Sequence, residues 1–204
     1  DTQKPILISS GMSSWKELDN AINTILNVHN KITVLQCTSE YPCSDNHIGL
    51  NIMLEMKDRY KLPVGLSDHS ISNYAVFAAV ALGASVVEKH LTFSKKMYGS
   101  DAKHSSEPSE FIDMVNGVRS IETIISSKIN KDLMADNMKN MKNIFQKSIV
   151  SLIDIPKGLK ITKRMIGFKK PGTGIPASDY KSVLGKIAKK NIKKDNLILR
   201  KDLI

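Results

Sequence analysis

The sequence predicts an α/β protein built on a parallel sheet or barrel and followed by a small β-rich module. Short apolar runs alternate with helical patterns along the first 127 residues, which is the order typical of parallel α/β folds. Polar residues follow each apolar run. Beyond residue 147, short β-prone pieces are separated by Pro and Gly, and this change indicates a second compact unit.

Four apolar runs are predicted to be strands that are buried on both faces of a parallel sheet. They cover residues 5–8, 32–37, 62–66 and 84–87. Four helices are predicted after them, over residues 14–26, 50–60, 74–82 and 108–121, with Ser14 as an N-cap and Gly83 as a C-cap. In such folds the strands end at one edge of the sheet, where α/β barrels carry their active sites.

The charge is unevenly distributed along the chain. The net charge is +10, but residues 1–127 hold 11 Lys+Arg against 14 Asp+Glu, whereas residues 128–204 hold 19 against 6. A basic segment can attract nucleic acid, a membrane surface or an anionic small molecule. Aromatic residues for base stacking are nearly absent from it, so nucleic-acid binding is disfavoured.

The chain has the features of a cytoplasmic protein. No apolar run approaches the roughly 20 residues that cross a bilayer, and no secretory signal opens the sequence. Its two cysteines, Cys37 and Cys43, form no disulfide framework and fit a reducing compartment. Asp1 stands where Met would be expected, which suggests that the natural start lies upstream.

Two histidines suggest a metal site. His69 and His90 are 21 residues apart, about one strand–helix–strand unit, so neighbouring parallel strands would bring both imidazoles to one end of the sheet. Imidazole with oxygen ligands suits manganese, and imidazole also suits zinc. The alternative is a pair of buried histidines bonded to backbone.

Strand alternation predicts which neighbours of these histidines share their face of the sheet. Residues i and i+2 of a strand point to the same side, so Ser67 should lie with His69, and Glu88 with His90. Asp68 and Lys89 should then point to the opposite side. Lys89 is predicted to be structural, whereas Asp68 is either a site residue or a helix-capping or loop carboxylate.

Six motifs in order along the chain resemble the sialic acid synthase family, which includes N-acetylneuraminate and legionaminate synthases. Each motif is weak alone, but their order and spacing cover nearly the whole chain. The motifs are Ser9-Ser10-Gly11-Met12, Cys37-Thr38-Ser39-Glu40-Tyr41-Pro42, Gly65-Leu66-Ser67-Asp68-His69, Glu88-Lys89-His90, Gly99-Ser100-Asp101 with Ser105 and Pro108, and Lys169-Lys170-Pro171-Gly172-Thr173-Gly174-Ile175.

The resemblance implies the C-terminal half of a (β/α)8 TIM barrel followed by an SAF (antifreeze-like) domain. Residues 1–127 would be a partial barrel with strands five to eight, residues 128–146 a linker, and residues 147–204 the SAF domain. The chain would then lack an N-terminal half that carries a metal-proximal glutamate and a phosphate-binding lysine.

The activity implied by the resemblance is the condensation of phosphoenolpyruvate with an N-acetylated amino sugar to a nonulosonic acid and phosphate. The sugar would be N-acetylmannosamine or a 2,4-diacetamido-trideoxy-mannose. The cofactor would be Mn²⁺ or Mg²⁺. A homodimer is expected, with the SAF domain of one subunit covering the barrel of the other, and neither a membrane nor nucleic acid is an expected partner.

The resemblance also implies roles for individual residues. His69 and His90 would bind the metal and, with Glu88, form the catalytic group. Phosphoenolpyruvate would contact Ser9, Ser39 and Ser67, whose hydroxyls are neutral donors suited to phosphate. The sugar would contact Tyr41, Asp101 and Lys170. Lys170 stands where the family has an arginine, and keeps the charge but loses the bidentate fork.

Two other functions remain open. One is a different metal-dependent barrel lyase or aldolase, for which Lys89 is the only Schiff-base candidate, although its predicted direction is wrong. The other is an inactive fragment or binding module whose basic SAF-like domain binds anionic carbohydrate or nucleic acid, with steep salt dependence.

Overall fold

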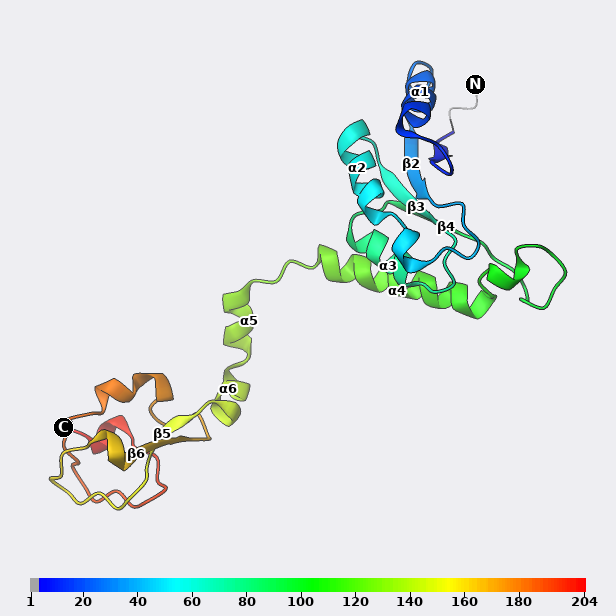
Figure 1. Ribbon diagram of the computed structural model, residues 1–204. Helices are drawn as coiled ribbons and strands as arrows, with labels where there is room; N and C mark the ends of the chain where they lie inside the picture. Colours follow the sequence, from blue (N-terminus) through cyan, green and yellow to red (C-terminus); the bar gives the residue numbers. More distant parts are fainter. Residues whose placement is uncertain (1–3) are drawn as a thin grey trace. The chain divides into compact units, whose positions relative to one another are not determined.

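A computed structural model describes residues 4–204 of the chain (Figure 1). The chain separates into two compact units, with the division after Lys128, and each unit is considered by itself. Across residues 4–204, every helix is too short or too polar to cross a membrane.

The first unit is built on a four-stranded parallel sheet whose strands follow one another in sequence order. Its strands are β1 (Ile6–Ser9), β2 (Ile32–Cys37), β3 (Val64–Asp68) and β4 (Val86–Lys89). All four predicted strands are thus present, with bounds that differ from the prediction by at most two residues. β3 and β4 pair in register up to their last residues, with Ser67 opposite Glu88 and Asp68 opposite Lys89.

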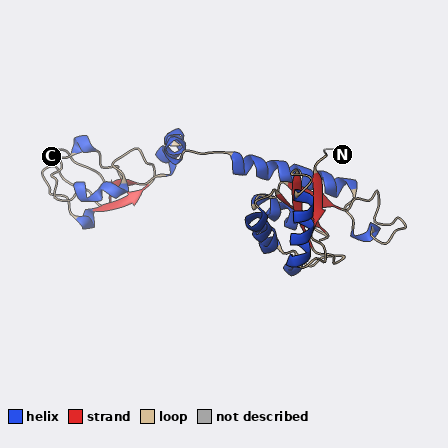
Figure 2. Ribbon diagram, turned by 90° about the horizontal axis from the view of Figure 1, so that it is seen from above, coloured by secondary structure: helices blue, strands red, loops and turns tan. Residues whose placement is uncertain are grey.

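Helices alternate with these strands, as Figures 1 and 2 show. The predicted N-cap of the first helix is confirmed, because the Ser14 side chain accepts from the backbone N–H of Glu17 and the Glu17 carboxylate accepts from the backbone N–H of Ser14. The helices are α1 (Trp15–Leu26), α2 (Leu50–Tyr60), α3 (Tyr74–Ala81) and α4 (Pro108–Ser126).

The apolar core lies between the helices and one face of the sheet. Val34, Val64 and Leu66 of the strands pack with Leu18 of α1 and Met53 of α2. Strand alternation therefore assigns the residues between them to the opposite face. That face carries Gly65 and Ser67 of β3, which pair in register with Val86 and Glu88 of β4.

Gly65 is required by the close approach of neighbouring strands on this opposite face. A Cβ added at residue 65 would lie 2.3 Å from the backbone oxygen of Val86 and 2.6 Å from Cδ2 of Leu35. The carbonyl of Val86 belongs to β4 and has no side-chain freedom with which to give way. Glycine thus sets the spacing between β3 and β4.

The second unit has its own core around a two-stranded antiparallel sheet of β5 (Ser148–Ser151) and β6 (Ile166–Lys169). Isoleucines along residues 149–198 form most of that core, and short turns link them, as the Pro- and Gly-separated pattern predicts. The segment predicted as a linker carries two short helices, α5 (Lys131–Asn137) and α6 (Lys139–Phe145).

Candidate functional site

Three rings meet at the carboxyl ends of β2, β3 and β4. His69 follows β3 directly and His90 follows β4 directly, and their ring centroids are 5.1 Å apart at an interplanar angle of 81°. Tyr41, in the loop after β2, lies 4.2 Å from the His69 ring and 5.7 Å from the His90 ring. The expectation that adjacent parallel strands bring the two imidazoles together is confirmed.

The imidazole of His69 is oriented by the backbone of the neighbouring loop. Its Nδ1 lies 2.9 Å from the carbonyl oxygen of Thr38. A carbonyl can only accept, so Nδ1 donates this hydrogen bond, and in the neutral imidazole Nε2 then carries the lone pair. This is the arrangement found in metal-binding histidines, whose second nitrogen is held by a carbonyl or carboxylate.

Carboxylates flank the two histidines on the same side of the sheet. The hydroxyl of Ser67 donates to Oε1 of Glu88 at 2.7 Å, which places both residues on one face as alternation predicted. Nδ1 of His90 lies 3.7 Å from Oδ2 of Asp101. Glu88 and Asp101 are exposed, whereas Ser67 and His69 are buried, so the cluster opens toward solvent on its carboxylate side.

Tyr41 is set to act as a hydrogen-bond donor. Tyr41 is 47% exposed, and partial desolvation of its phenol raises the pKa, as do the nearby ionisable groups of Cys37, Asp101 and Glu88. The phenol therefore stays protonated near neutral pH and can donate to an oxygen of a bound molecule. Its neighbours Asp101 and Glu88 belong to the same cluster.

The opposite side of the same two strand ends holds a closed ion pair. Nζ of Lys89 lies 2.5 Å from Oδ2 of Asp68, and the two side chains are 2% and 0% exposed. Both side chains point away from the histidine face, as predicted. Lys89 is fully engaged in this pair, which argues against a Schiff-base role.

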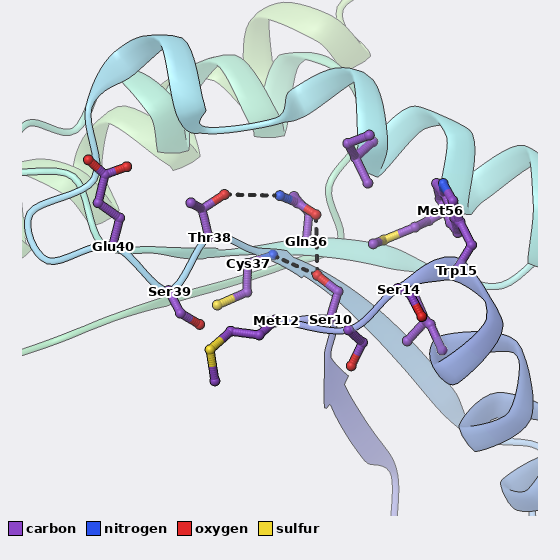
Figure 3. A pocket seen from close by; sticks show the side chains of 14 residues that line it. Ser10, Met12, Ser14, Trp15, Gln36, Cys37, Thr38, Ser39, Glu40 and Met56 are labelled. Carbon is purple, nitrogen blue, oxygen red and sulfur yellow. Dashed lines mark hydrogen bonds between the residues drawn. The ribbon is translucent and has the colours of Figure 1, made fainter.

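A pocket of the first unit lies between α1, α2 and the loop after β2 (Figure 3). Its volume is about 450 Å³, and Ser10, Thr38 and Ser39 line it with apolar residues that include Trp15 and Met56. Buried Gln36 joins its walls, because it accepts from the Ser10 hydroxyl at 3.2 Å and donates to Oγ1 of Thr38 at 3.4 Å.

The remaining predicted site residues lie outside the ring cluster. Ser9 ends β1 opposite Leu35 and is exposed, whereas its neighbour Ser10 is buried and accepts from the backbone N–H of Cys37. Ser39 lines the pocket. Lys170 belongs to the second unit, where its Nζ lies 4.8 Å from the centre of the Phe145 ring. Its neighbour Lys169 is paired with Asp195.

The described residues offer two imidazoles to a metal ion, and residues 4–204 hold no group of three or more His, Cys, Asp and Glu side chains arranged around one point. The free Nε2 of His69 and the neighbouring His90 ring fit two positions of a coordination sphere. Water or other groups would have to complete it, which suits Mn²⁺ and Mg²⁺, ions that commonly retain water ligands.

The comparisons with known proteins identify the family. Residues 1–130 match the NeuB family and residues 146–204 match the SAF domain. The chain therefore belongs to the NeuB family. The N,N'-diacetyllegionaminic acid synthase of Campylobacter jejuni is 41% identical over 96% of this chain and 59% of its own length. The enzyme of the same name from Legionella pneumophila is 32% identical over 96% of this chain and 56% of its own length.

The fold is also that of a solved synthase. The N-acetylneuraminic acid synthetase of Leptospira borgpetersenii, solved with citrate, has a TM-score of 0.61 and 26% identity over 68% of this chain and 50% of that chain. The predicted fold class, a half barrel followed by an SAF domain, is confirmed. The chain spans less than two thirds of the length of these relatives.

Sequence reasoning missed three groups that shape the site. The carbonyl of Thr38 orients His69, and a backbone acceptor leaves no trace in side-chain patterns. Ser10 is the buried serine of its motif, where Ser9 was expected to act. Gln36 could have been found, because it is the one amide in the otherwise apolar run that became β2.

Proposed function

We propose that the protein carrying this chain is a nonulosonic acid synthase that condenses phosphoenolpyruvate with an N-acetylated amino sugar. The single observation that supports this most strongly is the approach of His69 and His90, with ring centroids 5.1 Å apart, beside Ser67 and Glu88. The similarity to two enzymes named N,N'-diacetyllegionaminic acid synthase supports it independently.

In this proposal His69 and His90 hold a divalent cation, Mn²⁺ or Mg²⁺. When bound, the cation supplies Lewis-acid polarisation of the aldehyde oxygen of the open-chain sugar. Glu88 orients the sugar and is itself held by the Ser67 hydroxyl. Protonated Tyr41 donates to a sugar oxygen, and Asp101 accepts from sugar hydroxyl groups.

The bond-forming step joins C3 of phosphoenolpyruvate to the aldehyde carbon. Water then adds at C2, and the resulting tetrahedral intermediate expels inorganic phosphate. Ser9 and Ser39 offer neutral hydroxyl donors to the phosphate, and Ser67 joins them by turning its one hydroxyl proton from Glu88 to the phosphate. The protein contributes mainly by positioning two reactants and stabilising developing charge.

The sugar that we propose as first choice is the 2,4-diacetamido-trideoxy-mannose, with N-acetylmannosamine as the alternative. The names of the two legionaminic acid synthases favour the diacetamido sugar. The loop after Asp101 reads Ala102-Lys103-His104, and we propose that it contributes to the choice.

We further propose that the protein acts as a homodimer in which Lys170 reaches the N-acetyl group of a sugar bound by the partner subunit. Lys170 is exposed, and Lys169 beside it is occupied by Asp195. Lys170 contacts the Phe145 ring and not a carboxylate, so it is the lysine of the two that we assign to the partner's sugar.

The test uses the protein expressed from its whole reading frame, with Mn²⁺, phosphoenolpyruvate and each sugar in turn. We expect phosphate release that depends on both the sugar and the metal, faster with the diacetamido sugar, and a product mass equal to sugar plus pyruvate. The absence of sugar-dependent phosphate release with either sugar would contradict the proposed reaction. Equal rates would contradict only the proposed role of the Asp101 loop.

A further inference from the structure

We propose that Asp68 and Lys89 are positioning residues whose buried ion pair holds the ends of β3 and β4 at the spacing that allows His69 and His90 to bind one divalent cation. The inference rests on the proposed function, because it concerns the metal that this function requires. It assigns a role in that site to two residues on the opposite side of the sheet.

The pair lies directly beside both histidines in the chain. Asp68 is the last residue of β3 and Lys89 the last residue of β4, and the two pair in register. His69 and His90 are the next residues. Any displacement of the strand ends at residues 68 and 89 is therefore passed through one peptide bond to each imidazole.

Every polar atom of the pair is engaged. Nζ of Lys89 lies within 2.6 Å of Oδ2 of Asp68 and of the carbonyl oxygen of Ser70, and 3.1 Å from that of Ser72. An ammonium group has three protons, so its donors are all used. Asp68 also accepts from the backbone N–H and the hydroxyl of Ser70. Together these bonds join β3, the turn that follows it, and β4.

Stability alone is a poor explanation for such a pair. Removing two charges from water is costly, and replacing a buried ion pair with apolar groups of similar volume is often neutral or stabilising. Directional bonds, in contrast, define one arrangement of the groups that they join. The property that the pair provides is a fixed geometry at residues 68–72 and 89.

His90 is the histidine that depends most on this geometry. Its ring has Asp101 as a charged neighbour only at 3.7 Å, whereas His69 has a 2.9 Å bond to the Thr38 carbonyl. The backbone of His90 is also fixed by Ser106, whose N–H donates to the His90 carbonyl at 2.9 Å. The ring position therefore follows from the backbone at residues 89 and 90.

The test compares Mn²⁺ binding by the full-length protein with binding by the double variant Asp68→Asn/Lys89→Met. Asparagine keeps an acceptor for Ser70, methionine resembles the lysine stem in shape, and neither change leaves an isolated buried charge. The matched control is Arg119→Met/Glu122→Gln, which removes an exposed ion pair on α4. The free-ion Mn²⁺ electron paramagnetic resonance signal reports binding, and thermal unfolding without metal reports folding.

We expect the double variant to raise the Kd for Mn²⁺ by about ten- to a hundredfold, the range typical for groups that support metal ligands, with a Tm close to that of the control. A merely structural pair would change the Tm and leave the Kd unchanged. A Kd within twofold of the unmodified protein overturns the proposal while the proposed function stands.

Two further outcomes are decisive. If the unmodified protein binds no Mn²⁺, the proposed metal site fails, and this proposal fails with it. If the double variant does not fold, Ser70→Ala replaces it, because that change removes only the hydroxyl that donates to Asp68 and leaves both charges paired. A several-fold rise in Kd is then expected, and an unchanged Kd overturns the proposal.

Discussion

The two faces of the β3 and β4 ends differ in how their polar side chains are satisfied. On the helix side, Lys89 and Asp68 are almost fully buried and bond to each other and to the adjacent turn. On the opposite side, Glu88 and Asp101 are exposed, and His90 has a charged neighbour only at 3.7 Å. Successive residues of the same strands thus supply a closed structural layer and an open layer that can accept a ligand.

The largest expected loss of stability comes from removing one partner of the buried ion pair between Lys89 and Asp68. Lys89→Met alone leaves the Asp68 carboxylate buried without its partner, and breaking a buried pair in this way costs about 3–5 kcal/mol of unfolding free energy. His90→Gln alters the open layer, so it should change that free energy little and abolish Mn²⁺ binding. Urea unfolding and Mn²⁺ titration of both variants check the contrast. Similar losses of unfolding free energy in Lys89→Met and His90→Gln would contradict the proposed difference between the two layers.

A smaller effect is expected from the hydrogen bond between Ser67 and Glu88 in the open layer. Ser67→Ala removes the hydroxyl that donates to Glu88 at 2.7 Å, and loss of such a bond typically costs about 0.5–1.5 kcal/mol. The KM for phosphoenolpyruvate should also rise, because Ser67 is a proposed phosphate contact. Glu88→Gln is the matched variant, since its amide oxygen can still accept from Ser67. A KM that rises equally in both variants would argue against a direct contact of Ser67 with the phosphate.

A pH-dependent effect, confined to alkaline pH, is expected at another closed contact on the helix side, between α1 and α2. The Tyr60 hydroxyl donates to Oδ1 of Asp19 at 2.8 Å. Burial, followed by this hydrogen bond, raises the pKa of Tyr60 to about 12. Since the pKa is higher in the folded state, the stabilisation is complete below the ordinary tyrosine pKa of about 10 and is lost as the pH rises to about 12.

Tyr60→Phe should therefore reduce the loss of stability between pH 10 and pH 12, which urea unfolding across that range would measure. Tyr74→Phe is the control, because Tyr74 is 77% exposed. An unchanged pH profile in Tyr60→Phe would mean that other groups cause the alkaline loss.

Much of the first unit could be predicted because local patterns and tertiary structure agree there. The apolar runs became parallel strands, and the range predicted for the second helix, residues 50–60, is that of α2. The alternation rule assigned Ser67, His69, Glu88 and His90 to one face, because a strand's period of two leaves no other arrangement. The predicted roles of these residues stay predictions.

Other features could not be predicted because they depend on contacts between distant segments. Ser10, and not the predicted Ser9, is the buried serine of its motif. β1 ends at Ser9, and the hydroxyl of Ser10 donates to Gln36, which is 26 residues away. The pairing of Lys169 with Asp195 joins residues that no spacing rule connects. The segment at 128–146 was predicted only as a linker, because its polar composition hides the two short helices that it forms.

The close contact at Gly65 has a practical consequence for protein engineering. A mutant library meant to change the sugar that we propose as the substrate can vary the exposed Tyr41, where new side chains meet solvent. Randomising residue 65 in the same library would waste most of its members, because every side chain would press on the Val86 carbonyl and push the fourth strand outward. Selection for altered specificity should therefore keep this position constant.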